Sequence, residues 1–411
     1  MASGVDMKVV FLSYAFPPQI APRATQVARL AQYSSLPIRV LCAGMPGTEP
    51  ALRTGVEIVR FPDTSSRWWR RAKRLLLLPD SERPWADRLA KTILTNDLVE
   101  PNDVLATFGQ PMSDHLAGLK IKRRLGVPWI AHFSDPWSDN PYLSQNPVSR
   151  LRLRHMESQV FAAADRLLFT SDETVELVMR KHPAVWHGKA SVLPHAYDPA
   201  FDRDVAPWRG RAGPFVLRHL GNFYGPRNPL MLIRALVLLR KTQPSVLDNV
   251  KIELVGRWVD NERWSPADSG LPDSLLTFCK PVAYEESLRQ MCSADGLLII
   301  DAPFEHNVFF PSKLVEYLWA RRPILALTPP GTSANIVAAS GGVLASPETP
   351  ETIAAGLVNI IHRLRAGTAG APSEDIVTQY DARRVAEAFD RVVIDLVSTS
   401  KIEITRDRHV A

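Results

Sequence analysis

The stretch "FFPSKLVEYLWARRPI", residues 309–324, predicts a helix whose first turn is suited to hold an anion. The helix opens with Pro311-Ser312-Lys313, and a serine at a helix N-cap satisfies a backbone N–H group that has no partner within the helix. The N–H groups at that end attract anions, phosphates above all. Lys313 in the first turn opposes the helix dipole unless an anion lies beside it. We therefore expect an anion site at this corner.

Glu316 lies further along the same helix and has no obvious local role. A capping box with Ser312 needs Glu or Gln three residues later, where Val315 stands. The purely structural interpretation is an ion pair between Glu316 and Lys313, which would stabilise the helix by only roughly a few tenths of a kcal/mol. The alternative is that Glu316 faces a cleft and binds a ligand there.

The fold is predicted from the pattern on both sides of this stretch. Apolar runs such as "MKVVFLS", "DVLATF" and "WIAHFS" have the length of buried strands, and helical segments separate them. The pattern restarts after "PWRGRAGP", residues 207–214, with "FVLRHLG", "KIELVG" and "GLLIID". Strands that alternate with helices indicate a doubly wound parallel sheet. We predict an α/β protein with two Rossmann-like domains that face a cleft, residues 1–205 and 212–378, and a last segment, residues 379–411, whose helix returns to the first domain.

Composition indicates a globular protein in a reducing compartment. The 411 residues are too many for one ordinary core, and 45% apolar with 22% charged residues is usual for globular chains. The start of the sequence has no signal-peptide pattern, and three widely spaced cysteines suggest neither a disulfide framework nor a zinc site. These features predict a cytoplasmic protein.

A second corner with phosphate-binding character follows the first strand of the second half. In "LGNFYGPRNPLMLIRAL", Gly221 and Gly225 flank a short loop and Arg227 follows them. Alone, this is equally a glycine turn with a solvated arginine. Because ligands bind at the carboxyl ends of parallel strands, Arg227 and Lys313 are expected to meet and to hold a diphosphate. Neither the ATP-binding P-loop pattern nor the GxGxxG dinucleotide pattern occurs where it would be needed, which argues against ATPase and NAD-dependent functions.

Several blocks of the sequence resemble the retaining GT-B glycosyltransferases of family 4. They are "LGNFYGPRNPLMLIRAL", "KIELVGR", "VAYEESLRQMCSADGLLII", "FPSKLVEYLWARRPILA" and "GGVLASPETPETIAAGL" in the second half, and "LSYAFPP", "PWIAHFSDPW" and "LPHAYDP" in the first. The resemblance implies an N-terminal acceptor domain and a C-terminal donor domain for a nucleotide sugar. Glu316 then matches the second glutamate of the family's pair, which accepts hydrogen bonds from the donor ribose. The donor-binding residues that the resemblance implies are Gly221, Asn222, Arg227, Ser312, Lys313 and Glu316.

This sequence also departs from the family pattern. Val308 stands where the first glutamate of the pair is expected, and Glu305 is out of register. The loop after "PP" has no adjacent glycines, and its expected acceptor-side residues are Pro18, Ala21 and Arg23.

Catalysis is expected to involve residues after the strand "WIAHFS". Asp135 or His132 would orient the acceptor or assist as a base, although His132 is equally a satisfied histidine at a strand end and Asp135 equally a turn former before Pro136. No cofactor is expected. The Asp-x-Asp of "FDRD", residues 201–204, is interpreted as a solvated turn and not as a metal site, so the predicted transfer is metal-independent.

The positive charge is unevenly distributed. Residues 1–210 hold 27 Lys and Arg against 21 Asp and Glu, and the remainder holds 22 of each. Part of the excess lies in "RWWRRAKRLLLL", residues 67–78, whose cations and apolar residues suit an anionic membrane surface. The alternative is a helix or loop with its leucines in the core. No nucleic-acid-binding motif accompanies the charge. The residues of this possible peripheral membrane contact are Arg67, Trp68, Trp69, Arg70, Arg71, Lys73 and Arg74.

The sequence as a whole predicts a retaining glycosyltransferase that transfers a sugar from a nucleoside-diphosphate donor to a glycan or lipid-linked acceptor in polysaccharide or glycoconjugate synthesis. Two alternatives remain open. An isomerase of the nucleotide-sugar 2-epimerase kind would share the architecture and need no acceptor. A non-catalytic protein would bind the nucleotide sugar without turnover.

Overall fold

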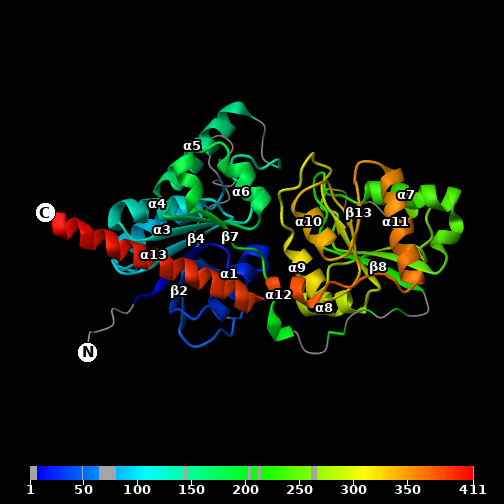
Figure 1. Ribbon diagram of the computed structural model, residues 1–411, viewed down its shortest axis with the longest axis horizontal. Coiled ribbons are helices and arrows are strands. Elements are labelled where there is room, and N and C mark those ends of the chain that lie inside the picture. Colours follow the sequence, from blue (N-terminus) through cyan, green and yellow to red (C-terminus); the bar gives the residue numbers. More distant parts are fainter. Residues whose placement is uncertain are drawn as a thin grey trace. The chain divides into compact units, whose positions relative to one another are not determined.

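The structure is a computed structural model of the chain, and it describes residues 7–410 apart from residues 49, 64–79, 143–145, 202–204, 207, 209, 211–213 and 261–265. The chain divides into two compact units. Unit 1 contains the chain up to Ala196 and again from Ala382, and unit 2 is Tyr197–Asp381. Each unit is built on one parallel sheet with helices packed on it (Figure 1). The predicted fold class, two Rossmann-like α/β domains, is confirmed.

Unit 1 contains a seven-stranded sheet in the order β3-β2-β1-β4-β5-β6-β7. Every neighbouring pair is parallel. The order reverses between β1 and β4, so this is the switch point at which doubly wound sheets bind ligands. The strands are β1 Val9–Ser13, β2 Ile38–Gly44, β3 Val56–Pro62, β4 Val104–Gly109, β5 Trp129–Phe133, β6 Arg166–Phe169 and β7 Ala190–Val192.

The helices of unit 1 connect these strands, and one of them comes from the far end of the sequence. α13 packs against α1. There the carboxylate of Asp390 accepts hydrogen bonds from the hydroxyls of Ser34 (2.6 Å) and Ser35 (2.8 Å). The α-helices are α1 Pro22–Tyr33, α3 Arg83–Thr95, α4 Ser113–Leu125, α5 Pro147–Ala163, α6 Asp172–Met179 and α13 Ala382–Val410.

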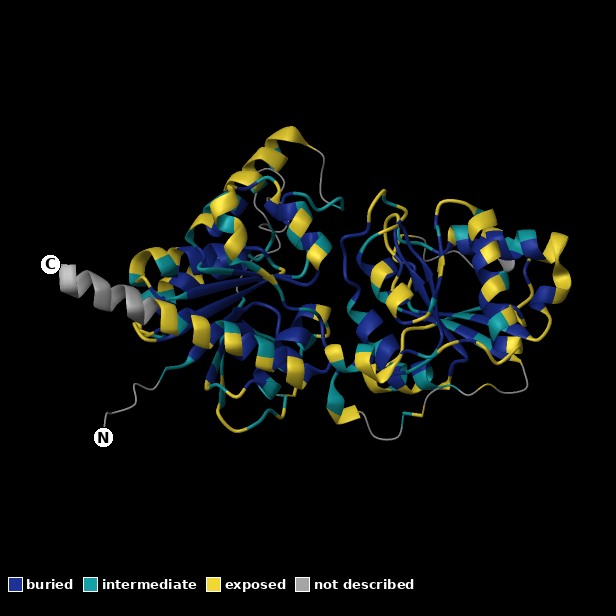
Figure 2. Cartoon of the chain, in the orientation of Figure 1, coloured by how far each residue is buried: buried dark blue, intermediate teal, exposed yellow. Residues whose placement is uncertain are grey.

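The strands of unit 1 are apolar on both faces because helices cover both sides of the sheet. All five residues of β1 are buried, as are all five of β5. One core cluster contains Trp85 and Trp129, and another contains Phe11 and Phe389. Figure 2 shows the buried strands between helices whose outer faces are exposed.

Unit 2 contains a six-stranded parallel sheet in the order β10-β9-β8-β11-β12-β13. Here the order reverses between β8 and β11. The strands are β8 Phe215–Leu220, β9 Val250–Val255, β10 Leu276–Cys279, β11 Gly296–Ile300, β12 Ile324–Leu327 and β13 Val343–Ala345.

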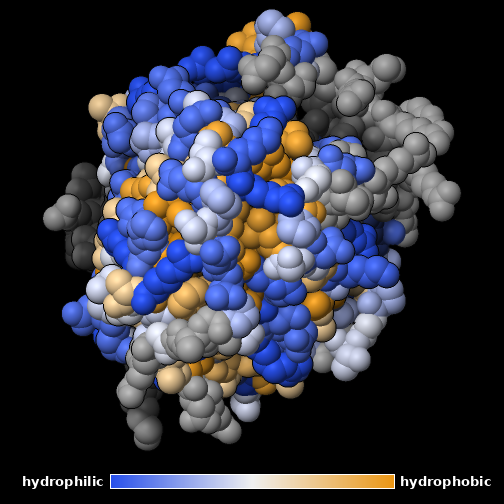
Figure 3. Space-filling model, turned by 90° about the vertical axis from the view of Figure 1, so that its right-hand side faces the viewer, coloured by the Kyte–Doolittle hydropathy of each residue, from blue (hydrophilic) through white to orange (hydrophobic). Residues whose placement is uncertain are grey.

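Helices again cover both faces of this sheet, over two apolar clusters. Seen from the side that carries α7 and α11 in Figure 1, hydrophobic side chains gather in the middle of the surface and hydrophilic ones surround them (Figure 3). The α-helices are α7 Leu230–Thr242, α8 Tyr284–Ser293, α9 Ser312–Trp319, α10 Thr332–Ala339, α11 Pro350–Arg365 and α12 Glu374–Gln379.

The basic segment, residues 67–78, lies outside the described residues, and so do residues 202–204 of the "FDRD" turn. Within the described part of the chain, no helix combines the length and the apolar character that a bilayer crossing requires.

Candidate functional site

The candidate donor site lies in unit 2, where strands β8 and β11 end side by side. Their carboxyl ends meet at the switch point of the sheet. The loop from Gly221 to Pro229 follows β8 and leads into α7, and residues 301–311 follow β11 and lead into α9. The predicted residue Arg227 stands on the first connection, and Lys313 stands at the end of the second, in the first turn of α9.

Lys313 lies in the first turn of α9 and contacts a histidine at the end of β8. The Nδ1 of His219 lies 2.9 Å from the carbonyl oxygen of Leu298, which can only accept, so Nδ1 carries the proton. The other ring nitrogen, Nε2, therefore accepts from the Nζ of Lys313 at 3.1 Å. Burial, and secondarily the charge of Lys313, hold the pKa of His219 well below its usual range, which keeps the ring neutral.

The charge on Lys313 is poorly compensated. Burial, and then the positive charge of Arg227, lower the pKa of Lys313 from 10.5 to about 7, while Asp301 acts in the opposite direction. Gly221 gives the ammonium group its space, because a Cβ there would lie 2.8 Å from Nζ. The φ of Gly221 is +140°, which also favours glycine. An arriving anion would restore the protonated form of Lys313.

Arg227 is held by one carboxylate and one aromatic ring. Its Nη2 lies 3.3 Å from an oxygen of Asp301, and the guanidinium lies over the ring of Tyr224 at 5.5 Å from the centroid. The side chain of Arg227 is 11% exposed and that of Asp301 is 1% exposed. This fixes the guanidinium at the end of β8.

Asp301 is the centre of a buried hydrogen-bond network behind Arg227. Its second oxygen accepts from the Nδ2 of Asn307 (2.7 Å) and from the hydroxyl of Thr328 (2.9 Å). Asn307 also binds the loop before α10, where a Cβ on Gly331 would lie 2.0 Å from the backbone oxygen of Asn307. The loops after β11 and β12 are thereby locked together beneath Arg227.

Glu316 and Ser312 are both half-buried on α9. One oxygen of Glu316 accepts from the hydroxyl of Tyr284 at 2.6 Å. Ser312 is not the N-cap that the sequence suggested. Pro311 occupies that position and Ser312 is the first helical residue, and no side chain caps this end. A proline has no hydroxyl to offer the first-turn N–H groups. The N–H of Leu314 donates to the carbonyl of Pro311 at 2.9 Å, which leaves those of Ser312 and Lys313 for a ligand.

The remaining donor-side residues form the loop framework. Asn222 is exposed, and its Oδ1 accepts from the backbone N–H of Arg257 at 3.0 Å. Val308, at the position of the missing glutamate, is buried with 8% exposure, whereas Glu305 is exposed.

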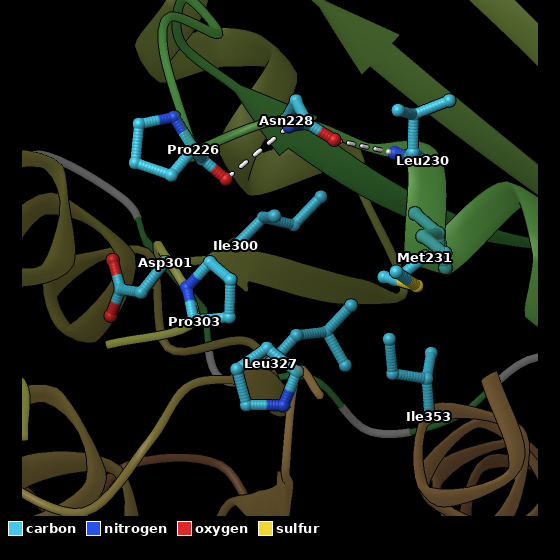
Figure 4. Close-up of a pocket in the computed structure, with 11 residues that line it drawn as sticks. Pro226, Asn228, Leu230, Met231, Ile300, Asp301, Pro303, Leu327 and Ile353 are labelled. Atoms are coloured by element: carbon cyan, nitrogen blue, oxygen red, sulfur yellow. Dashed lines mark hydrogen bonds between the residues drawn. The ribbon is translucent and has the colours of Figure 1, made fainter. Parts of the chain in front are cut away.

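A small pocket lies beside Asp301 (Figure 4). Its volume is about 120 Å³, which is too small for a nucleotide sugar. Asn228 borders it and orders the entry to α7, since its Oδ1 accepts from the backbone N–H of Leu230 at 3.1 Å. The lining is otherwise mostly apolar and includes Pro226, Leu230, Met231, Ile300, Pro303, Leu327 and Ile353.

The predicted acceptor-side residues lie in unit 1, at the carboxyl ends of β1 and β5. Pro18 is in the loop after β1, Ala21 is the N-cap of α1, and Arg23 is in the first turn of that helix. Arg23 is 6% exposed, and its Nη1 lies 2.9 Å from the Nδ1 of His132. Asp135 is half-buried just after β5, and one of its oxygens accepts from the side chain of Gln110 at 3.0 Å.

His132 is a buried and fully engaged histidine. Because a guanidinium only donates, the Nδ1 of His132 accepts from Arg23, and Nε2 donates to the carbonyl of Leu193 at 3.3 Å. Burial, and then the charge of Arg23, hold the pKa of His132 well below its usual range. Of the two expected catalytic side chains, only Asp135 is partly exposed.

Sequence reasoning missed three residues that organise these sites: His219, Tyr284 and Asp114. A polar residue inside the apolar strand "FVLRHLG" was the available signal for His219. Tyr284 begins α8 and carried no signal, because its contact with Glu316 depends on packing between two helices. Asp114 is fully buried, and its Oδ2 accepts from the backbone N–H of Tyr14 at 2.7 Å.

Residues 20–196 match the family described as Glycosyl transferase 4-like domain. No curated protein matches the chain by sequence.

Solved structures of glycosyltransferases share the fold over almost the whole chain. HepE from Anabaena, in complex with UDP and glucose, superposes with a TM-score of 0.66 at 15% identity, over 95% of this chain and 100% of that one. Sucrose-phosphate synthase from Thermosynechococcus elongatus gives 0.72 at 13% identity, over 96% and 100%. An α,α-trehalose-phosphate synthase (UDP-forming) from Burkholderia xenovorans gives 0.65 at 12% identity, over 94% and 99%. The chain therefore has the GT-B fold of these glycosyltransferases, and its residues 20–196 match the model of the glycosyl transferase 4-like domain.

Proposed function

We propose that the chain is a glycosyltransferase that moves a sugar from a nucleoside-diphosphate donor to a glycan or lipid-linked acceptor, with retention of the anomeric configuration. The main support for this proposal is that Arg227 and Lys313 lie near each other where β8 and β11 end. The charge of Arg227 lowers the pKa of Lys313. Asp301 forms an ion pair with Arg227 and acts to raise the pKa of Lys313. Two neighbouring cations above one buried carboxylate favour a ligand with more than one negative charge.

The same residues would assist the chemical step. Breaking the anomeric bond leaves negative charge on the departing diphosphate, and donors already placed where that charge develops stabilise the transition state. In the proposal, Arg227 and Lys313 supply these donors together with the first-turn N–H groups of α9. No cofactor is assigned, and persistence of activity in EDTA is the test of metal independence.

Glu316 is assigned to the donor ribose. Its carboxylate is half-buried on the same helix as Lys313 and accepts a hydrogen bond from the hydroxyl of Tyr284. A carboxylate accepts several hydrogen bonds at once, which suits it to the hydroxyl groups of a ribose. Uridine is the first base to test, because HepE was solved with UDP and UDP-glucose.

Asp135 is assigned to the acceptor. It is the partly exposed carboxylate after β5, and Gln110 orients it. His132 is assigned a positioning role, because both of its ring nitrogens are engaged and the neutral ring fixes Arg23. The proton of the attacking hydroxyl then passes to the leaving phosphate or to Asp135.

The test is the unfolding temperature of the protein with UDP, GDP, ADP, CMP and dTDP. A ligand present at 100 times its Kd stabilises by about 2.7 kcal/mol, which such a measurement detects. We expect one diphosphate to stabilise the wild type and Arg227→Ala to lose the effect, while Arg240→Ala, at the far end of α7, keeps it. Incubation with the matching nucleotide sugar but no acceptor then separates transfer from epimerisation. Absence of any shift in a folded protein would refute donor binding.

A further inference from the structure

Unit 1 holds a cluster of buried polar atoms that lack hydrogen-bond partners among the described residues. The six atoms belong to loops or first helical turns that follow β1, β4 and β5, which are neighbours in the sheet. They therefore gather at one edge, at the switch point of unit 1. The atoms are Gln19 Oε1, Arg23 Nε, Arg23 Nη2, Asp114 Oδ1, His115 Nε2 and Trp137 Nε1.

Arg23 is the charged member of this cluster. Its Nη1 is already used, donating to the Oε1 of Gln26 (2.6 Å) and to the Nδ1 of His132 (2.9 Å). The two unpartnered nitrogens, Nε and Nη2, form the edge of the guanidinium that binds two oxygens of a carboxylate or phosphate side by side. The side chain is held at its other corner, so this edge is fixed in orientation.

The positive charge of Arg23 is not paired within the described structure. Burial lowers its pKa to about 10, so the group stays charged at neutral pH. Asp135 and Asp114 attract it only at a distance. Burial holds the pKa of Asp114 well above its usual range, which weakens that carboxyl as a counter-charge for Arg23. Burying a cation without a hydrogen-bonded counter-charge is costly unless a ligand supplies that charge.

We propose that Arg23 binds an anionic group of the acceptor, a phosphate or a carboxylate, through Nε and Nη2, and that the acceptor of this enzyme is consequently a charged molecule. The inference rests on the proposed function, since it concerns the acceptor of the same reaction. Trp137 provides a further N–H group at this edge, and His115 provides a ring nitrogen. His132 keeps the arginine in place.

The test uses the full-length protein and titrates sodium phosphate, sodium acetate, glucose 6-phosphate and glucose at constant ionic strength, by calorimetry and by unfolding temperature. We expect phosphate or acetate to bind, and the anion that binds identifies the acceptor group. Glucose 6-phosphate should bind more tightly than glucose if the group is a phosphate. Arg23→Gln should lower the affinity for the anion by about 10- to 100-fold, which is the usual range for the loss of hydrogen bonds to a charged group.

Two further variants make the result specific. Arg123→Gln removes the same charge from an exposed site on α4 and should leave anion binding unchanged. Arg23→Lys keeps the charge without the two-nitrogen edge and should bind as weakly as Arg23→Gln. If Arg23→Gln fails to fold, the wild type and Arg23→Lys still decide the question.

The proposal would be overturned if the wild-type protein bound neither phosphate nor acetate. It would also be overturned if the Arg23 variants bound the anion as tightly as the wild type does. In the first case ordered water alone fills the cluster. Binding of UDP that depends on Arg227 is a separate readout in unit 2. If UDP binds but no anion binds in an Arg23-dependent way, this inference is refuted and the proposed function stands. If the anion binds through Arg23 but UDP does not bind, the proposed function is refuted.

Discussion

Lys313 should make the binding of a nucleoside diphosphate strongly dependent on pH. In the empty site its pKa is lowered to about 7 by burial and by Arg227. A bound diphosphate places negative charge beside the ammonium group and returns its pKa towards the ordinary value of 10.5. Binding then takes up a proton. Affinity is greatest below pH 7 and is lost as the pH rises through the pKa of the empty site.

The size of the effect follows from these two values. When the complex holds the proton throughout, Kd rises in inverse proportion to the protonated share of the empty site, which gives a loss of affinity of roughly 15-fold between pH 7 and pH 8.5. The second ionisation of a phosphate, near pH 6, is nearly complete over this range and adds little. The groups that act on Lys313 are His219 at the end of β8, Arg227 before α7 and Asp301 after β11, and Glu316 stands one turn later on α9.

Calorimetric titration at pH 7, 7.5, 8 and 8.5, in buffers of different ionisation enthalpy, measures both Kd and the protons taken up. Lys313→Arg is the control, because a guanidinium remains protonated across this range. We expect its Kd to stay flat. A flat Kd in the wild type, or a slope that persists in Lys313→Arg, would refute the assignment of the titration to Lys313.

Three other predictions test separate parts of the structure. Glu316→Gln should lower the affinity for the nucleotide by about tenfold, and Tyr284→Phe should lower it much less, because the carboxylate and not the tyrosine is assigned to the ribose. Equal losses of affinity for the two variants in calorimetry would contradict this assignment. Glu157→Gln should lower the free energy of unfolding by about 3–5 kcal/mol, since it breaks a buried charge network. Glu157 is fully buried and lies 2.7 Å from a lysine ammonium and 3.1 Å from a histidine ring; a denaturation midpoint like that of the wild type would exclude this role. Gly331→Ala should destabilise more than Gly367→Ala, since both have positive φ but only the first meets a backbone oxygen, 2.0 Å from the added Cβ.

Much of the architecture was predictable because each element carries a local signal. Parallel strands covered on both faces are continuous apolar runs, and "MKVVFLS" and "GLLIID" have that form. The corner at Lys313 was visible for the same reason: a cation in the first turn of a helix is unfavourable without an anion. The exact cap was not predictable, and Pro311 takes the position assigned to Ser312, because neighbouring residues compete for a cap within one turn.

The sequence by itself determined which residues stand at the ends of strands, and hence that Arg227 and Lys313 follow two strands of one sheet. Only the tertiary structure decided what surrounds them. The contact of His219 with Lys313 joins residues that are 94 positions apart, and that of Arg23 with His132 joins residues 109 apart. Such contacts depend on strand order and on how each side chain is buried. Burial is what makes Lys313 easily deprotonated and leaves Arg23 a charged group that needs an anion, since the cost of holding a charge depends on its exclusion from water.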